Sequence, residues 1–306
     1  MKSRLLTAMF LSLAAVSMQA QSAKEALEEV FNLYYQDRES EARQRLEGIQ
    51  ESSLSSENDT IKFQYYYIKT SLLDVLAGDG DTQLKTVARQ RELIDKALEI
   101  LETRLDVHNA QYLELMAQKA NYYNLLDGDI DKAILTYERA LVVGSYLRGE
   151  GAEEFDYWYG NIFWQLANLY EQKGYEKQLV ALYKSMADVM PSDGDVPPYI
   201  GYILLGGYYE RHGKYREAAD ANRQALDIIE KREGKGLNYV QTLKSIGNNQ
   251  IKAGMNREAA DTFDEAIELA ESDPACAGEL PELMYGSAEA LKCLKKSKKN
   301  TDGVGW

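Results

Sequence analysis

Proline is scarce in this chain, and no segment has the pattern of a β-strand. The 306 residues include 5 prolines, three of which lie close together at Pro191, Pro197 and Pro198. A chain with so few helix breakers can form long helices. Nowhere does the sequence alternate Val, Ile or Thr with polar residues, as half-buried strands do. We therefore expect an all-α protein, and the apolar content of 45% is sufficient for a continuous core.

Cysteine and histidine are also scarce, which limits the chemistry that we expect. Cys276 precedes the last predicted helix and Cys293 lies inside it, so helix rise places their Cα atoms about 18 Å apart. A disulfide requires less than about 7 Å. We therefore expect both thiols to be free or buried, and a bridge is the alternative if the loop before the last helix folds back. The two histidines, His108 and His212, do not have metal-ligand spacing, and the chain has neither a nucleophile elbow nor a phosphate-binding glycine loop. We expect no enzyme activity, no cofactor and no metal site.

One acidic series needs separate treatment because it resembles part of a calcium-binding loop. Asp127, Asp129 and Asp131, followed by Glu138, have some of the required spacing, but Lys132 occupies the place where such a loop needs glycine. We interpret Asp131 instead as the residue that caps the start of the next helix.

The chain has fewer basic than acidic residues. Lys and Arg total 35 against 49 Asp and Glu, for a formal net charge of −14. Such acidity argues against nucleic acid and anionic membranes as partners and favours basic or neutral ones. The basic run near the C-terminus is most simply the end of a helix, where cations are favourable.

The first twenty residues have the pattern of a secretory signal peptide. Lys2 and Arg4 form a basic start, an apolar run follows from Leu5 to Val16, and small residues lead to Ala20. We expect cleavage after Ala20, with cleavage after Ser17 as an alternative. The apolar run is too short to span a bilayer, and no later stretch of the sequence qualifies. The protein is therefore expected to be exported, either to the periplasm or out of the cell.

A spacing of residues recurs three times in the second half of the chain. It begins with Leu or Ile followed by Gly or Ala, continues to a Gly, and ends with three residues at i, i+4 and i+7. The copies are Leu166, Ala167, Tyr170, Gly174, Leu179, Tyr183 and Met186; Leu205, Gly206, Tyr209, Gly213, Ala218, Asn222 and Ala225; and Ile246, Gly247, Gln250, Gly254, Ala259, Phe263 and Ala266.

Each part of this spacing has a packing reason. The small residue on the first helix allows a neighbouring helix to approach closely. Gly174, Gly213 and Gly254 fall where a helix must end, and glycine adopts the left-handed conformation of a C-terminal cap without strain. The later residues share one face of the next helix, so the pattern predicts antiparallel helix pairs.

This pattern resembles the tetratricopeptide repeat (TPR). A fourth copy begins at Ala120, and the markers Ala133, Leu179, Ala218 and Ala259 are 46, 39 and 41 residues apart, which is closer to the long repeats of kinesin light chains than to the usual period of about 34. The resemblance implies a right-handed α-solenoid. We predict a signal peptide in 1–20, degenerate N-terminal helical repeats in 21–106, TPR repeats in 107–272, a capping helix in 273–297 and a flexible tail in 298–306.

The resemblance also implies a binding groove, lined by the first helix of each repeat. The residue after the small Gly or Ala is expected to point into this groove. These residues are Asn121, Asn168, Gly207 and Asn248, so three of the four are asparagines. An amide both donates and accepts hydrogen bonds, so such a series can bind a peptide backbone without regard to its sequence. Ordinary repeat consensus is the alternative explanation. Trp164, in an aromatic-rich segment, is also expected to face the groove.

A second group of groove candidates is basic. Lys244 and Asn248 match the K-x-x-G-N that begins the carboxylate clamp of chaperone-binding TPR domains, and Lys252 and Arg211 are expected to face the same groove. Together they would hold a partner's C-terminal carboxylate. The basic residues that a full clamp takes from the following repeats are missing.

We interpret the chain as a non-catalytic protein-protein interaction scaffold of the cell envelope. The partner is expected to be a protein or peptide, and the pattern specifies neither its identity nor the oligomeric state. The alternative is a glycan-binding protein of a nutrient-uptake system, because exported proteins of the starch-utilisation type also contain these repeats. This chain is much shorter and lacks their lipid-attachment cysteine.

Overall fold

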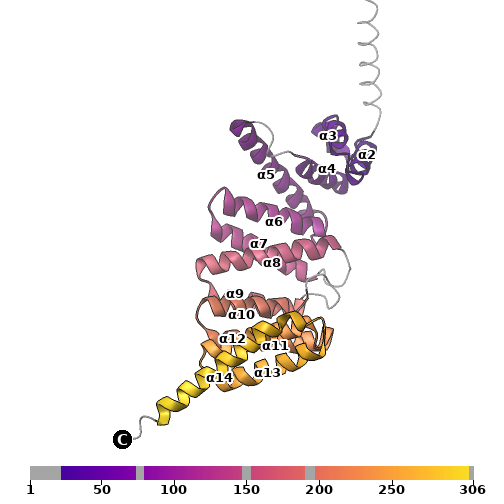
Figure 1. The fold of residues 1–306 in the computed structure, drawn as a ribbon. Coiled ribbons are helices and arrows are strands. Elements are labelled where there is room, and N and C mark those ends of the chain that lie inside the picture. Colours follow the sequence, from indigo (N-terminus) through magenta and orange to yellow (C-terminus); the bar gives the residue numbers. More distant parts are fainter. Residues whose placement is uncertain (1–21, 74–78, 147–152, 190–196, 303–306) are drawn as a thin grey trace, which may run out of the picture. The chain divides into compact units, whose positions relative to one another are not determined.

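The computed structural model describes residues 22–73, 79–146, 153–189 and 197–302, and every element in these ranges is helical (Figure 1). The prediction of an all-α chain of antiparallel helix pairs is confirmed. The predicted signal peptide lies outside the described residues. Backbone contacts divide the chain into two compact units, which are described separately: the first contains residues 1–147 and 157–162, and the second contains 148–156 and 163–306.

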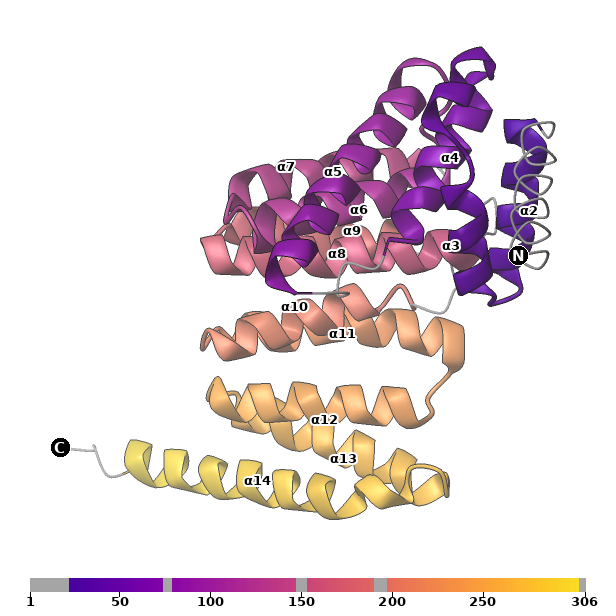
Figure 2. The same ribbon diagram turned by 90° about the horizontal axis from the view of Figure 1, so that it is seen from above.

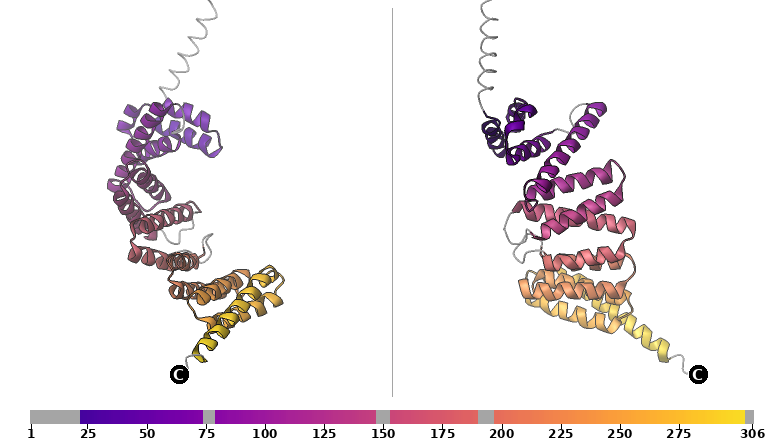
Figure 3. Two further views of the ribbon diagram at one scale, coloured as in Figure 1. Left: turned by 60° about the vertical axis from the view of Figure 1, so that its left-hand side comes forward. Right: turned by 180° about the vertical axis from the view of Figure 1, so that it is seen from behind.

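The first unit consists of helix pairs around a core of Leu, Ile, Val and Tyr side chains. α2 packs on α3 and on α4, α4 packs on α5, and α6 packs on α7 (Figure 3). Leu27 and Val30 of α2 meet Tyr65 and Ile68 of α4 in the core. The elements are α2 (Ala23–Tyr35), α3 (Glu39–Glu47), the 3-10 helix η1 (Glu51–Ser56), α4 (Asp59–Ser71), α5 (Gly80–Thr103), α6 (Ala110–Leu125), α7 (Ile130–Tyr146) and residues 157–162 of α8 (Glu153–Lys173).

In the second unit the helices from α9 to α14 pack in chain order, each against the next (Figure 2). It contains the remainder of α8, α9 (Glu176–Val189), α10 (Ile200–Arg211), α11 (Tyr215–Glu233), α12 (Leu237–Lys252), α13 (Asn256–Ser272), the 3-10 helix η2 (Ala277–Glu279) and α14 (Leu280–Asp302). Residues 298–302, which the sequence assigned to a tail, therefore belong to α14.

The turn within each repeat has the predicted glycine cap. Gly174, Gly213 and Gly254 have φ of 70°, 70° and 77°, in the left-handed region. After Gly213 and Gly254, the next backbone N–H donates to a carbonyl of the last helical turn, at 2.9 Å and 2.8 Å respectively. This bond satisfies a carbonyl that the helix end would otherwise leave without a partner.

The small residues of the first helices allow close packing, as predicted. A Cβ added to Gly247 of α12 would lie 2.7 Å from the ring of Phe263 on α13, and one added to Gly286 of α14 would also collide with this ring. Phe263 is fully buried. Its ring is thus held between two helices at positions where only glycine fits.

Two details differ from or extend the sequence analysis. α7 begins at Ile130, and its cap is Asp129, whose Oδ1 accepts the Lys132 N–H at 3.1 Å. The prediction that Asp131 is the cap was wrong, because the helix begins one residue before it. Both cysteines are free thiols, and Cys276 is buried in the core of the second unit.

Candidate binding surfaces

The three predicted inner-face asparagines differ in their surroundings. Asn168 on α8 and Asn248 on α12, both in the second unit, are exposed. Neither amide has a hydrogen-bond partner among the side chains that the structure describes. Asn121 on α6, in the first unit, is half-buried, and its Oδ1 accepts the Tyr137 hydroxyl at 2.8 Å. Asn121 therefore ties α6 to α7, which takes up one of its lone pairs.

Two of the predicted basic residues form ion pairs between the first helices of successive repeats in the second unit. Arg211 on α10 contacts Glu171 on α8 at 2.9 Å, and Lys252 on α12 contacts Glu210 on α10 at 2.6 Å. The two pairs repeat one arrangement, because a basic residue near the end of each first helix reaches back to a carboxylate of the previous first helix.

Lys244 is more deeply placed and has two carboxylate partners. Its ammonium lies 2.5 Å from Glu279 and 2.8 Å from Glu282. Burial lowers the pKa of Lys244, but the hydrogen bonds to the two carboxylates outweigh this effect, and the pKa is raised overall. A charge that already has two partners gains little from a third carboxylate. The structure places the three basic clamp candidates in internal ion pairs.

Trp164 lies on α8, and its side chain is 52% exposed, whereas its neighbour Phe163 is buried. Tyr159, one turn earlier, is also buried, and its ring lies where a side chain at Gly144 would be. Within the described part of the aromatic-rich segment, Tyr159 and Phe163 therefore fill packing space, whereas Tyr157, at 64% exposure, and Trp164 are available for contact.

A cavity of about 590 Å³ lies in the first unit, between α2, α4 and the start of α6. We call it the aromatic–amide groove. It is lined by Glu28, Phe31, Asn32, Tyr35, Thr60, Phe63, Gln64, Tyr67, Asn109 and Gln111.

The groove is built from one repeated helix face. α2 contributes its residues 28, 31, 32 and 35, and α4 contributes residues 60, 63, 64 and 67, which are equivalent positions 32 residues later. Residues at i, i+3, i+4 and i+7 share one side of a helix. The opposite sides of both helices face the core. Side-chain caps start the two helices, with Ser22 accepting the Glu25 N–H at 3.2 Å and Asn58 accepting the Ile61 N–H at 3.0 Å.

Each of these two helices presents a stacked pair of rings. Phe31 and Tyr35 have centroids 6.2 Å apart and Phe63 and Tyr67 have centroids 5.8 Å apart, both with an interplanar angle of 27°. Tyr35 is 72% exposed. The Tyr67 hydroxyl donates to Glu114 of α6 at 2.6 Å, which fixes one ring of the second pair.

Each of the three helices also presents one unpaired amide to the groove. Asn32 of α2, Gln64 of α4 and Gln111 of α6 have no hydrogen-bond partner within the described parts of the chain. Asn109, by contrast, is committed to capping α6, because its Oδ1 accepts the Tyr112 N–H and its amide group donates to the Asp106 carbonyl. The groove thus combines ring faces with free donors and acceptors.

Sequence analysis missed this groove, although a signal was present. The segments FNLYY (31–35) and FQYYY (63–67) share aromatic, amide and tyrosine positions. The repeat pattern has a glycine at the turn, whereas the turn after α2 has Asp37 in the left-handed conformation, with φ of 57°. The first helix pair was therefore recognised only weakly.

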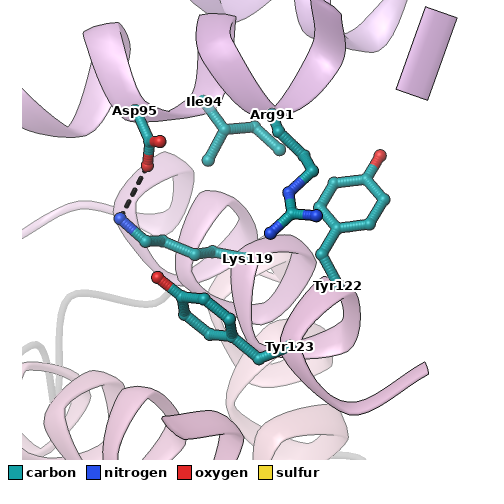
Figure 4. Close-up of a pocket in the computed structure, with 6 residues that line it drawn as sticks. All are labelled: Arg91, Ile94, Asp95, Lys119, Tyr122 and Tyr123. Carbon is teal, nitrogen blue, oxygen red and sulfur yellow. Dashed lines mark hydrogen bonds and ion pairs between the residues drawn. The ribbon is translucent and has the colours of Figure 1, made fainter. Parts of the chain in front are cut away.

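A smaller crevice between α5 and α6 carries no candidate chemistry. Figure 4 shows Lys119 of α6 reaching Asp95 of α5, at 2.6 Å, beside Arg91, Ile94, Tyr122 and Tyr123. Its volume of about 20 Å³ has room for about one water molecule. Arg91 is also paired, with Asp127 at 2.6 Å.

The described ranges contain neither a metal-binding cluster nor a helix suited to a membrane. No group of three or more His, Cys, Asp or Glu side chains there is placed to hold a metal ion. No helix among the described residues combines the length and apolar character needed to cross a bilayer.

The chain is similar to solved structures with TPR-like repeats, as the sequence predicted. TPR-like repeats assigned to a kinesin light chain of Podosopora anserina are 16% identical and cover 71% of this chain and 99% of theirs, with a TM-score of 0.41. The apo quorum sensor NprR from B. thuringiensis is 17% identical over 92% of this chain and 76% of its own (TM-score 0.42), and BtubC from P. vanneervenii is 21% identical over 82% and 89% (TM-score 0.41). No protein-family model and no curated protein matches the chain.

Proposed function

We propose that this protein is a non-catalytic interaction scaffold that binds an extended segment of a partner protein in the aromatic–amide groove. The observation that carries the proposal is the combination of two stacked ring pairs with three unpaired amides, one on each of α2, α4 and α6. An extended backbone offers donors and acceptors that amides bind in any sequence. Ring faces bind apolar side chains and anchor such contacts.

In this proposal the second unit offers the partner protein a further contact surface. Asn168, Asn248 and Trp164 are exposed and offer amides and a large ring. Arg211, Lys244 and Lys252 have no part in binding, because a partner's carboxylate would have to displace the carboxylates that already contact them.

We also propose that the scaffold acts after export, in the cell envelope or outside the cell. The support is the basic, apolar and small-residue pattern of residues 1–20. Removing Lys2 and Arg4 with this segment makes the mature chain still more acidic than its formal charge of −14.

Selection from a peptide library tests the binding proposal. The mature chain from Gln21 is immobilised and presented with a phage library of random peptides, and in parallel with a glycan array, because rings and amides also suit sugars. Selected peptides should bind the wild type and lose affinity for Asn32→Ala combined with Gln64→Ala. Binding to glycans alone, with loss in the same double variant, would instead establish the alternative of a glycan-binding protein.

A further inference from the structure

The spacing of the aromatic–amide groove matches one backbone conformation of the partner segment. α2 and α4 are in direct contact, and helices in contact have axes about 8–10 Å apart. A polyproline II helix advances about 3.1 Å per residue and repeats every three residues, or about 9 Å. A chain in this conformation that crosses the helices would place equivalent residues on the Phe31–Tyr35 pair and on the Phe63–Tyr67 pair.

The unpaired amides suit the same conformation. A polyproline II helix has no internal hydrogen bonds, so its carbonyl oxygens need donors from outside. Asn32 and Gln64 occupy equivalent positions on neighbouring helices and therefore share the spacing of the ring pairs. Gln111 of α6 adds a third amide. Proline itself has no N–H, which leaves carbonyls as the groups to be satisfied.

Proline rings also suit the exposed ring of Tyr35. Grooves lined with aromatic side chains bind proline-rich segments, because these segments are already ordered before binding and lose little entropy. Tyr35, at 72% exposure, offers a ring face that a flat proline ring can cover.

The charge of the groove favours a basic segment. The described residues that line it include the carboxylate of Glu28 and no lysine or arginine. Lys24 contacts Glu28 at 3.8 Å, but both side chains are more than 60% exposed, so this pair is weak and leaves Glu28 accessible to a partner's cation. Glu114 lies directly behind Tyr67. A lysine or arginine of the partner would be attracted by these carboxylates and by the ring faces.

Building on the proposed function, we propose that the groove binds a proline-rich, basic peptide segment in the polyproline II conformation. The segment crosses α2 and α4, with prolines on the two ring pairs, carbonyls on Asn32 and Gln64, and a basic side chain near Glu28.

Fluorescence anisotropy with three labelled peptides tests this inference on the mature chain. The probes are repeats of Lys-Pro-Pro, Lys-Ala-Ala and Glu-Pro-Pro, each about nine residues long, which in polyproline II spans about 28 Å. The Lys-Pro-Pro peptide should bind about tenfold more tightly than either of the others. Equal binding of Lys-Ala-Ala would overturn the need for proline, and equal binding of Glu-Pro-Pro would overturn the need for positive charge.

Two tyrosine variants show whether binding occurs in the groove. Tyr35→Ala should weaken Lys-Pro-Pro binding about tenfold, whereas Tyr285→Ala, on the equally exposed Tyr285 of α14, should not change it. If both substitutions changed the affinity for the Lys-Pro-Pro peptide equally, the inference would be wrong. If the random library yields proline-free peptides that still need Asn32 and Gln64, the inference fails while the proposed function stands. If only glycans bind, both fail.

Discussion

At the scale of single residues, Glu51 is a carboxylate that two basic side chains and a hydroxyl contact within the chain. Its carboxylate, at the start of η1, accepts from Lys96 at 2.7 Å, from Arg89 at 2.9 Å and from the Tyr66 hydroxyl at 3.1 Å. These groups come from α4 and α5, so one side chain joins three elements of the first unit. The Lys96 hydrogen bond, helped by Arg89 and Tyr66, lowers the pKa of Glu51 to about 2 despite the opposing effect of burial.

Glu51 should make the stability of the first unit depend on acid. Because its pKa is lower in the folded chain than its ordinary value of 4.5, its contribution is fully present above pH 4.5 and is lost as pH falls through about 2. Glu51→Gln should reduce the free energy of unfolding at pH 7 by about 1–2 kcal/mol, after allowance for solvent screening of side chains that are about a third exposed.

Urea unfolding at pH 7 and pH 3 measures this effect. The difference between wild type and Glu51→Gln should shrink at the lower pH, whereas Glu47→Gln, at an exposed position on α3, should match the wild type at both. A constant difference between the two pH values would show that the charge of Glu51 is not responsible.

The ion-pair partners of single residues could not be predicted from the sequence. Lys252 and Arg211 were correctly placed on the first helices, but their carboxylate partners lie 42 and 40 residues earlier. Only the stacking of helices brings such residues together, and no local pattern indicates it. The residues predicted as ligands for a partner's carboxylate therefore turned out to be paired within the chain.

At the scale of helices, the turn glycines and small residues made most of the second unit predictable. Gly213 and Gly254 indicate left-handed turns already in the sequence, because few residues other than glycine tolerate that conformation. In the first unit Asp37 occupies the same kind of turn, but an aspartate in the sequence does not indicate a left-handed turn, because aspartate occurs in many other conformations. The helices that form the aromatic–amide groove were therefore the ones that the sequence predicted least well.

The packing of Phe263 gives a prediction at this scale. Gly247→Ala should lower the free energy of unfolding by about 1–3 kcal/mol, because the added Cβ meets a ring that Gly286 prevents from moving away. Gly207→Ala is the matched control. Its Cβ would have its nearest neighbour at 3.6 Å, so it should raise stability by about 0.5–1 kcal/mol through its helix propensity. Thermal and urea unfolding of both variants provide the comparison, and a neutral Gly247→Ala would refute the packing account.

At the scale of the whole molecule, the chain is acidic and every element in its described residues is helical. In the first unit, α2, α4 and α6 form the groove with its unpaired amides, and in the second unit the paired cations hold neighbouring first helices together. The fold class was predictable because it depends on a pattern repeated along the chain. The aromatic–amide groove was not, because it depends on side chains from α2, α4 and α6 meeting in space.

Export is tested on the whole protein. The full-length chain is expressed with a bacterial secretion system, and the mature protein is isolated from the envelope and medium fractions. Intact mass spectrometry should show an N-terminus at Gln21, because the small-residue exit ends at Ala20. An intact Met1 in protein confined to the cytoplasm would refute the proposal.

Titration calorimetry with a library-selected peptide tests the central claim most directly. Asn32→Ala combined with Gln64→Ala removes two amides from the aromatic–amide groove, and Asn168→Ala combined with Asn248→Ala removes two exposed amides from the second unit. With each neutral hydrogen bond contributing about 1 kcal/mol, the first pair of substitutions should weaken binding about tenfold or more, with helicity by circular dichroism unchanged. The second pair should leave the affinity of this short peptide as it is. The opposite pattern would contradict the account and return the binding site to the inner-face asparagines of the second unit.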